Sequence, residues 1–233
     1  MAIDAKDAAD FYATRRGLIA ARLIRERLAA AWPDLTGRAV LGIGYPLPYL
    51  RLWREQATRC VAVVPAHMGA ARWPRGRPNL AALAEEDALP FEDTSFDHVL
   101  VIHGLEQAET ARRMLREIWR VLEPEGRLIV VVPNRTSPWA YLERTPFGHG
   151  QPYTPSQLGR LLKDCLFHVE RHDTALVLPP VVGATPGLAR IAERVRRAMP
   201  RMSGVIMVEA VKDVAGVVPL RAQRRRLLLA VPA

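Results

Sequence analysis

The sequence predicts an α/β fold in which helices cover both faces of a mostly parallel sheet. Short, continuous apolar runs alternate along the chain with segments whose apolar residues recur at helical spacing. That pattern is typical of strands buried on both faces and connected by helices. The run TGRAVLGIGYPLPY at 36–49 passes from a buried strand through a tight turn toward a helix. In folds of this kind such a turn is where a ligand is expected.

Composition favours one sizeable domain with an appended element. The chain has 233 residues, 49% of them hydrophobic, which is enough for one core. Cys60 and Cys165 are too few and too far apart for a disulfide scaffold or a metal cluster. We therefore expect two reduced core thiols in a cytoplasmic protein, and no metal site.

The net charge of +9 does not by itself predict a nucleic-acid partner. Lysine occurs only at positions 6, 163 and 212, so arginine supplies nearly all of the 33 basic residues, a bias typical of a GC-rich bacterial genome. The start, MAIDAKDAADFY, lacks the basic and apolar regions of a signal peptide. No window approaches the roughly 18 consecutive apolar residues of a transmembrane segment.

The individual elements follow from periodicity and from turn signals. Residues 4–32 are predicted to form one amphipathic helix that stops near Pro33. Strands are expected at 39–44, 60–64, 80–83, 95–103, 127–133, 166–178 and 204–211. Further helices are expected at 109–122 and, from the capping box at Thr154, to about Cys165.

Candidate catalytic side chains lie at the carboxyl ends of the strands. His103 follows the fourth strand, beside the turn at Gly44, and Gly104 and Glu106 come after it at the same edge. A histidine there suits a general base because its pKa is near neutrality, or it caps the strand end by hydrogen bonds. The loop 134–153 is rich in aromatic residues, as a pocket wall is, and its His149 either holds a substrate or ties down the loop.

Several stretches resemble class I S-adenosylmethionine (SAM)-dependent methyltransferases, in the branch called methyltransferase type 11. The string DALPF at 87–91, followed by SFD at 95–97, is one of them. The string REIWRVLEPEGRLIVVVPN at 116–134 matches the family pattern E-x-x-R-V-L-K-P-G-G-x-L. The window GIGYPLP at 42–48 stands where the family has its glycine-rich loop, D-x-G-x-G-x-G.

This resemblance, over about residues 38–178, implies a Rossmann-like three-layer sandwich. Its seven-stranded sheet has the order 3-2-1-4-5-7-6 and is mostly parallel, with one antiparallel strand at the end. A methyltransferase-like domain is then expected over 1–218, with an N-terminal helix at 1–33 and an inserted helix at 179–203 between the last two strands. A basic tail at 219–233 follows.

The resemblance also implies SAM as the cofactor and suggests the residues that contact it. Tyr12 stands where an early tyrosine folds over the cofactor, and Gly42 and Gly44 lie in the loop window. Asp87 is expected to contact the adenine amino group, and the amide of Ala88 to contact a ring nitrogen. His103 is implied to lie on the substrate side of the cofactor, where it serves as a cofactor contact and a catalytic candidate.

The chain departs from the family at two cofactor contacts. Pro46 and Pro48 replace two loop glycines, and proline fixes φ and has no N–H donor. The second strand ends at Val64 or Pro65, where relatives carry the acid that takes both ribose hydroxyls. Gly44 alone keeps the loop pattern.

Two functions from different classes follow. The first is methyl transfer from SAM to an unidentified small-molecule acceptor, with His103 or His149 as the base. The alternative is a non-catalytic protein that keeps the fold, has lost or weakened SAM binding and acts as a binding or regulatory partner. A nucleic-acid acceptor is disfavoured, because IHGL at 102–105 replaces the Asn-Pro-Pro-Tyr motif of amino-methylating enzymes. The apolar stripe of the inserted helix suits packing against the domain or a homodimer partner.

Overall fold

The computed structural model describes residues 4–74, 76–142, 144–177 and 203–214. The strands are β1 (Ala39–Gly44), β2 (Arg59–Pro65), β3 (Ala81–Ala84), β4 (Phe96–Ile102), β5 (Leu122–Pro133), β6 (Phe167–Ala175) and β7 (Val205–Lys212). The helices are α1 (Ala5–Ala13), α2 (Arg15–Ala31), α3 (Leu47–Leu50), α4 (Ala111–Val121) and α5 (Pro155–Asp164), with 3-10 turns at Ala66–Met68, Pro138–Tyr141 and Pro146–Gly148. The inserted helix expected at 179–203, except its last residue, and the basic tail at 219–233 lie outside the described residues.

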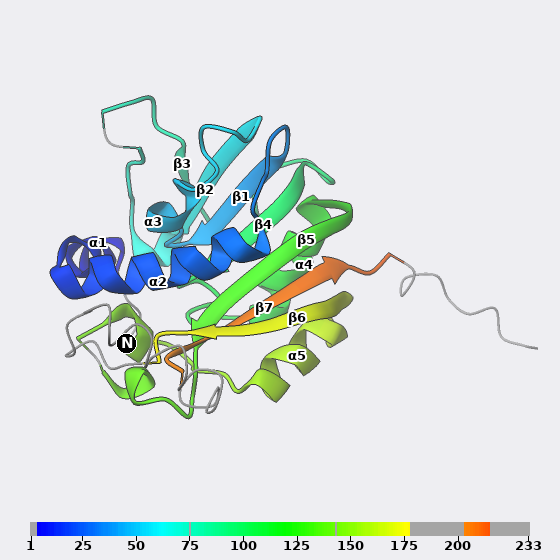
Figure 1. The fold of residues 1–233 in the computed structure, drawn as a ribbon. Coiled ribbons are helices and arrows are strands. Elements are labelled where there is room, and N and C mark those ends of the chain that lie inside the picture. The colour runs from blue at the N-terminus through cyan, green and yellow to red at the C-terminus, as the bar shows by residue number, and fades with distance from the viewer. Residues whose placement is uncertain (1–3, 75, 143, 178–202, 215–233) are drawn as a thin grey trace, which may run out of the picture.

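These strands form one seven-stranded sheet (Figure 1). Their order is β3-β2-β1-β4-β5-β7-β6. The strands from β3 to β5 pair in parallel, and β7 runs antiparallel to both β5 and β6. The predicted α/β fold, its strand order and its single antiparallel strand are confirmed.

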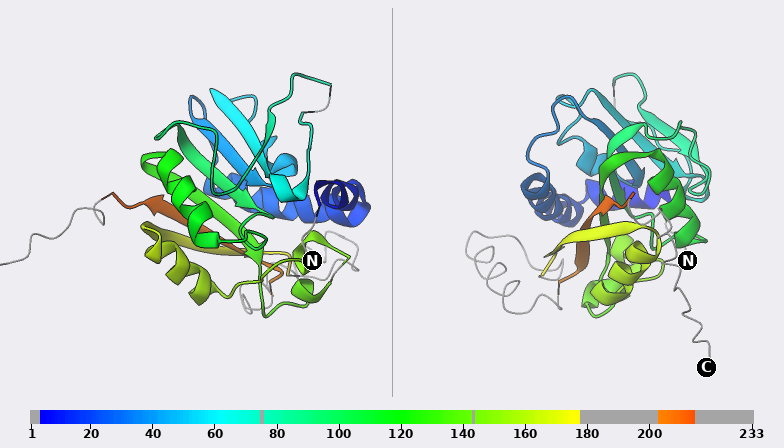
Figure 2. Two further views of the ribbon diagram at one scale, coloured as in Figure 1. Left: turned by 180° about the vertical axis from the view of Figure 1, so that it is seen from behind. Right: turned by 90° about the vertical axis from the view of Figure 1, so that its right-hand side faces the viewer.

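Helices cover both faces of the sheet, which makes three layers. Val40 and Leu100 belong to the core on the side of α1, α2 and α3. Leu41 and Val99, their neighbours in sequence, belong to the core on the side of α4 and α5. The left view of Figure 2, from behind, has this side of the sheet toward the viewer. Alternate side chains of a strand point to opposite faces, so burial of both faces explains the continuous apolar runs.

The N-terminal segment forms two helices, and the single helix expected over 4–32 is wrong. Thr14 separates them with an extended backbone (φ −75°, ψ 158°). Its Oγ1 accepts a hydrogen bond from the Gly17 N–H at 3.1 Å, so Thr14 caps α2. A Cβ added to Gly17 would lie 2.0 Å from the Phe11 carbonyl oxygen, so the two helices meet closely. A single capping residue makes the break, and apolar periodicity does not register a cap.

Other boundaries depart less from prediction. The helix expected after β1 is one short turn, α3, and β5 begins at Leu122 instead of 127. The capping box of α5 is confirmed: Thr154 Oγ1 accepts from the Gln157 N–H at 3.3 Å, and Gln157 Oε1 accepts from the Thr154 N–H at 3.1 Å. Cys60 and Cys165 are buried free thiols, and burial raises the pKa of Cys60 to about 12.

Candidate functional site

The turn after β1 packs directly against the end of β4. Gly44 has a φ of +95°, and a Cβ added there would lie 2.3 Å from the Ile102 carbonyl oxygen. The Tyr45 N–H donates a hydrogen bond to the same oxygen at 2.8 Å. Glycine alone allows both this φ and this approach. Gly44 therefore joins two strand ends, and the Tyr45 amide is already engaged.

Pro46 folds back over Gly42 and fills the space beside it. A Cβ added to Gly42 would lie 2.6 Å from Pro46 Cβ and 2.8 Å from Leu50 Cδ1. Pro48 and Pro46 have no N–H, and the Tyr49 N–H donates to the Pro46 carbonyl oxygen at 2.8 Å. This turn therefore lacks the series of backbone donors that a glycine-rich loop offers to an anionic group.

Five buried side chains, which we call the aromatic cluster, lie over the turn: Tyr12, Tyr45, Tyr49, His103 and Phe147. Each is at most 7% exposed. The Tyr12 hydroxyl oxygen lies 2.7 Å from the Tyr49 hydroxyl oxygen and 2.7 Å from His103 Nε2. The Tyr12 ring stacks on Tyr45 with centroids 5.9 Å apart and planes at 4°. The break between α1 and α2 thus places Tyr12 at the carboxyl edge of the sheet.

Burial keeps Tyr12 and Tyr49 of the cluster protonated. Desolvation, reinforced by the neighbouring phenol of Tyr49, raises the pKa of Tyr12 well above its ordinary value. Desolvation likewise raises the pKa of Tyr49. A neutral phenol donates one hydrogen bond, so each hydroxyl at this site has a single proton to place.

His103 follows β4 in the left-handed backbone region, with a φ of +54°. Its Nδ1 lies 3.3 Å from Glu106 Oε1, and Glu106 is 3% exposed. The second oxygen, Glu106 Oε2, has no hydrogen-bond partner within the described part of the chain. A non-glycine residue with positive φ is uncommon, and such strain concentrates at functional sites. The sequence placed both residues at this edge without showing their contact.

Asp87 lies on the loop between β3 and β4, away from the aromatic cluster. Its side chain is 41% exposed, and its Oδ2 lies 3.6 Å from Arg113 Nη1. It lines a cavity of about 100 Å³ together with His67, Glu85, Glu86, Glu109, Thr110 and Arg113. The amide expected to meet the adenine ring, that of Ala88, donates to the Glu85 carbonyl oxygen at 3.2 Å.

Glu86 brings a carboxylate to the end of β2, where the sequence showed no acid. Glu86 is 6% exposed, and its Oε2 lies 3.4 Å from Nδ1 of His67, which follows β2 closely. Its Oε1 accepts a hydrogen bond from the Glu109 N–H at 3.1 Å. The register that pairs Pro65 with Ala84 brings this acid beside β2. Sequence reasoning missed Glu86 because strand pairing, not position along β2, places it.

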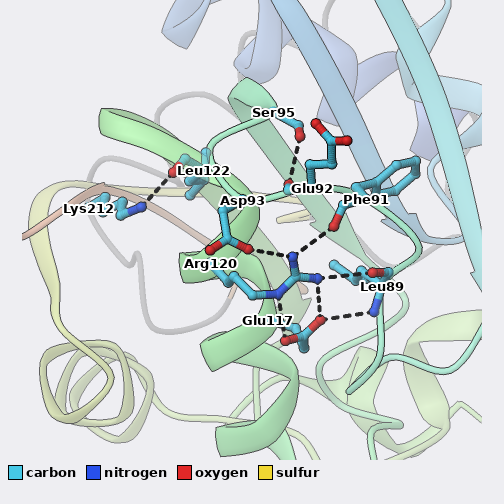
Figure 3. Close-up of polar contacts among 9 residues, drawn as sticks. All are labelled: Leu89, Phe91, Glu92, Asp93, Ser95, Glu117, Arg120, Leu122 and Lys212. Atoms are coloured by element: carbon cyan, nitrogen blue, oxygen red, sulfur yellow. Dashed lines mark hydrogen bonds and ion pairs between the residues drawn. The ribbon is translucent and has the colours of Figure 1, made fainter.

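Arg120 of α4 anchors the same loop, as Figure 3 shows. Its guanidinium donates to the carbonyl oxygens of Leu89 (3.0 Å) and Phe91 (2.7 Å) and pairs with Asp93 (2.9 Å) and Glu117 (2.7 Å). Glu117 Oε2 also accepts from the Leu89 N–H at 3.0 Å. Hydrogen bonding to Arg120 lowers the pKa of Glu117, and that bond raises the pKa of Arg120. Both side chains are therefore charged at neutral pH and fix the loop.

His149 lines a cavity, whereas His103 is buried in the aromatic cluster. This cavity, of about 440 Å³, is lined by Asp7, Asp10, Phe11, Thr14, Arg144, Thr145, Pro146 and His149. Phe147 contacts the His103 ring at 4.9 Å and the Phe11 ring at 6.1 Å between centroids. The structure thus brings Tyr12, Gly44 and His103 together, while Asp87 and His149 line cavities whose walls do not include these three residues.

Solved structures share this fold. The methyltransferase in a complex with the Haloferax volcanii Trm112 methyltransferase activator superposes with a TM-score of 0.61 at 21% identity, over 89% of this chain and 98% of that chain. A SAM-dependent methyltransferase of Thermotoga maritima, described as a possible histamine N-methyltransferase, gives 0.57 at 18% identity, over 85% and 93%. The structure described as the [4+2]-cyclase SpnF gives 0.56 at 20% identity, over 83% and 82%. The fold is that of class I SAM-dependent methyltransferases.

Residues 40–130 match the family model described as "Methyltransferase domain", of type 11. The resemblance seen in the sequence is confirmed. The demethylmenaquinone methyltransferase of Beutenbergia cavernae is 46% identical over 70 residues, 30% of this chain and 29% of that protein. The ubiquinone/menaquinone biosynthesis C-methyltransferase UbiE of Hahella chejuensis is 48% identical over 48 residues, 21% of this chain and 19% of that protein. The matched segments span less than a third of these relatives.

Proposed function

We propose that this protein transfers a methyl group from SAM to a small-molecule acceptor. The observation that carries the proposal is the methyltransferase-domain match over 40–130 on a chain with the methyltransferase fold. Gly44 ends β1 and His103 directly follows the neighbouring β4, at the edge where such folds bind their ligands. The relatives named above suggest an acceptor of the quinone kind.

Groups near the ends of β2 and β3 suit the adenosine half of SAM. The partly exposed carboxylate of Asp87 can accept from an adenine amino group. The carboxylate of Glu86, beside the end of β2, can accept from ribose hydroxyls and so replace the acid missing at Val64 and Pro65. Because Arg120 holds the loop on α4, Asp87 and Glu86 are presented on a fixed backbone.

The residues at the methionine end do not fit the cofactor in this arrangement. The amide of Tyr45 is engaged by Ile102, Pro46 has no N–H, and the aromatic cluster occupies the space over the turn. The proposal therefore includes a displacement of Tyr12 from His103 when SAM binds. In the reaction His103 is the proposed base, because its Nε2 already lies 2.7 Å from a hydroxyl oxygen.

The contact between Tyr12 and His103 also favours a second candidate, a non-catalytic methyltransferase-fold protein that acts as a binding or regulatory partner. Its buried Tyr12–His103 bridge completes the core without a ligand. The cyclase SpnF, which shares the fold, carries a name other than methyltransferase, so the fold alone does not fix the reaction. A protein partner is proposed for this candidate, in line with the Trm112 complex of the Haloferax volcanii relative.

The proposed cellular setting follows the sequence. The proposal includes a cytoplasmic location, no nucleic-acid partner and a homodimer contact through the segment 179–203, which the sequence predicts to be helical and which, except for residue 203, lies outside the described residues. None of the helices in the described ranges is long and apolar enough to cross a membrane.

Isothermal titration with SAM and with S-adenosylhomocysteine separates the two candidates. We expect micromolar binding by the wild type, after a check that neither compound copurifies. Asp87→Ala is expected to weaken it about 10- to 100-fold, since a charge-assisted hydrogen bond contributes about 1.5–3 kcal/mol. Asp164→Ala, which removes an exposed ion pair with Arg112, is the matched control and should leave binding unchanged.

Absence of heat and of thermal stabilisation at millimolar concentrations of both compounds would sink the enzyme proposal. It would leave the non-catalytic candidate. Binding that Asp87→Ala does not weaken would instead remove Asp87 from the proposed cofactor contacts.

A further inference from the structure

We propose that Glu106 and His103 form a proton-accepting pair, and that the place now filled by the Tyr12 hydroxyl is where the hydroxyl of a phenol or enol acceptor binds. The inference rests on the proposed function for the statement that this hydroxyl belongs to a methyl acceptor. The pair itself is argued from the geometry of the buried site.

The proposal takes Glu106 as ionised and His103 as neutral, and these two states give the hydrogen bonds among the buried groups a single direction. If Glu106 is ionised it can only accept, so His103 donates its Nδ1–H across 3.3 Å. His103 Nε2 then carries a lone pair and accepts the Tyr12 hydroxyl proton across 2.7 Å. The Tyr12 oxygen in turn accepts from the Tyr49 hydroxyl across 2.7 Å. Glu106 thus fixes the tautomer that makes Nε2 a proton acceptor.

The ring of Tyr12 fills a slot shaped for a flat hydroxylated ring. Tyr45 stacks on it at 5.9 Å and Tyr49 meets it edge to face at 5.9 Å, and both belong to the segment after β1, not to α1. Tyr12 comes from α1, which Thr14 separates from α2. Since α1 is a helix of its own, its departure would vacate the slot without unwinding α2.

In the proposed step the acceptor takes the place of Tyr12 and gives its hydroxyl proton to His103. The O–H bond breaks, an N–H bond forms at Nε2, and the electron pair stays on the acceptor oxygen. The Glu106 carboxylate balances the imidazolium through Nδ1–H. Its free Oε2 has no competing hydrogen-bond partner in the described part of the chain.

Glu106 is a positioning residue, because it acts through His103. Its backbone carbonyl oxygen also accepts the Gln151 N–H at 2.6 Å, which ties the loop around 150 to the site. Glu106→Gln keeps that backbone bond and the side-chain shape while removing the charge. It therefore tests the electrostatic role separately from the structural one.

The test uses 4-nitrophenol, whose phenolate absorbs visible light that the neutral phenol does not. The full chain is titrated with the probe at a pH below the pKa of the free probe. We expect binding to the wild type with a rise in phenolate absorbance, and tighter binding to Tyr12→Ala, which empties the slot. His103→Asn should abolish the phenolate signal and Glu106→Gln should reduce it at least tenfold. The exposed His168 is the control, and His168→Asn should change nothing.

The proton-accepting pair is overturned if 4-nitrophenol binds without a rise in phenolate absorbance. It is also overturned if that absorbance is unchanged in His103→Asn and Glu106→Gln. No binding by either the wild type or Tyr12→Ala overturns the slot. If Tyr12→Ala does not fold, ¹⁵N spectra of the histidine rings decide for the pair: wild type and Tyr12→Phe should carry the His103 proton on Nδ1, and an Nε2–H tautomer contradicts the proposal. The probe needs no SAM, so the two proposals can fail separately. If SAM binds but the 4-nitrophenol test is negative, only the proton-accepting pair and its slot are removed. If the 4-nitrophenol test is positive but SAM does not bind, only the methyltransferase proposal is removed.

Discussion

At the scale of single residues, the candidate site depends on two unusual backbone positions that meet where β1 and β4 end. Gly44 has a positive φ and lies against the Ile102 carbonyl, and His103 adopts a positive φ in the turn that follows. The first allows the strand ends to approach each other, and the second places the imidazole beside Glu106 and Tyr12. The sequence marked both residues because each follows an apolar run.

Gly44→Ala is expected to destabilise the fold far more than Gly37→Ala. Both glycines have positive φ, +95° and +77°, but an added Cβ meets Ile102 O at 2.3 Å in the first and nothing within 4 Å in the second. Backbone strain alone costs about 1–2 kcal/mol. We therefore expect about 1–2 kcal/mol for Gly37→Ala and at least about 3 kcal/mol for Gly44→Ala, measured by urea unfolding. Equal losses would contradict the close packing of the strand ends.

At the scale of elements, α4 positions the loop that bears Asp87. Arg120 makes hydrogen bonds to two loop carbonyls and ion pairs with Glu117 and Asp93, so one side chain joins helix and loop. The sequence string at 116–134 predicted the helix and the following strand. It could not show that its arginine reaches back across about thirty residues to the loop.

Arg120→Ala is expected to cost about 2–3 kcal/mol and to weaken SAM binding by loosening the Asp87 loop. Hydrogen bonds to charged groups contribute about 1.5–3 kcal/mol, and only part of the Arg120 network is exposed to screening solvent. Arg112→Ala on the same helix removes an exposed pair with Asp164 and should cost no more than about 1 kcal/mol. Thermal unfolding and titration of both variants check this. Full cofactor affinity in Arg120→Ala would exclude the anchoring role.

At the scale of the whole molecule, sequence and structure agree on the frame and differ on the contacts. Apolar runs predicted β1, β4 and β5, which are buried on both faces of the sheet. The strand order was implied by the family resemblance. The bridge between Tyr12 and His103 joins positions 91 residues apart, and periodicity carries no information on such pairs. Apolar periodicity also failed to predict the position of Glu86 and the helix break at Thr14. Strand pairing places Glu86, and a side-chain cap makes the break.

Stability of the whole fold should fall as the pH drops from about 6.5 to about 4, because of His98. Desolvation beneath Trp32, whose ring centroid lies 4.7 Å away, lowers the His98 pKa from 6.5 to about 4. Between pH 6.5 and about pH 4, His98 binds a proton in the unfolded chain but not in the folded chain. The contribution of neutral His98 to stability is therefore complete above pH 6.5 and is lost as the pH falls toward 4. His98→Phe should flatten this part of a curve of unfolding free energy against pH. An unchanged slope would show that His98 is not the group responsible.

The position of Tyr12 on its own helix has a consequence for kinetics. If a ligand can enter only after α1 has swung away, the observed association rate stops rising with ligand concentration and levels off at the opening rate of the helix. The apparent affinity is reduced by the fraction of molecules that are open at any moment. Two ligands of very different chemistry would then show the same limiting association rate, because the opening of α1, and not the ligand, determines that rate.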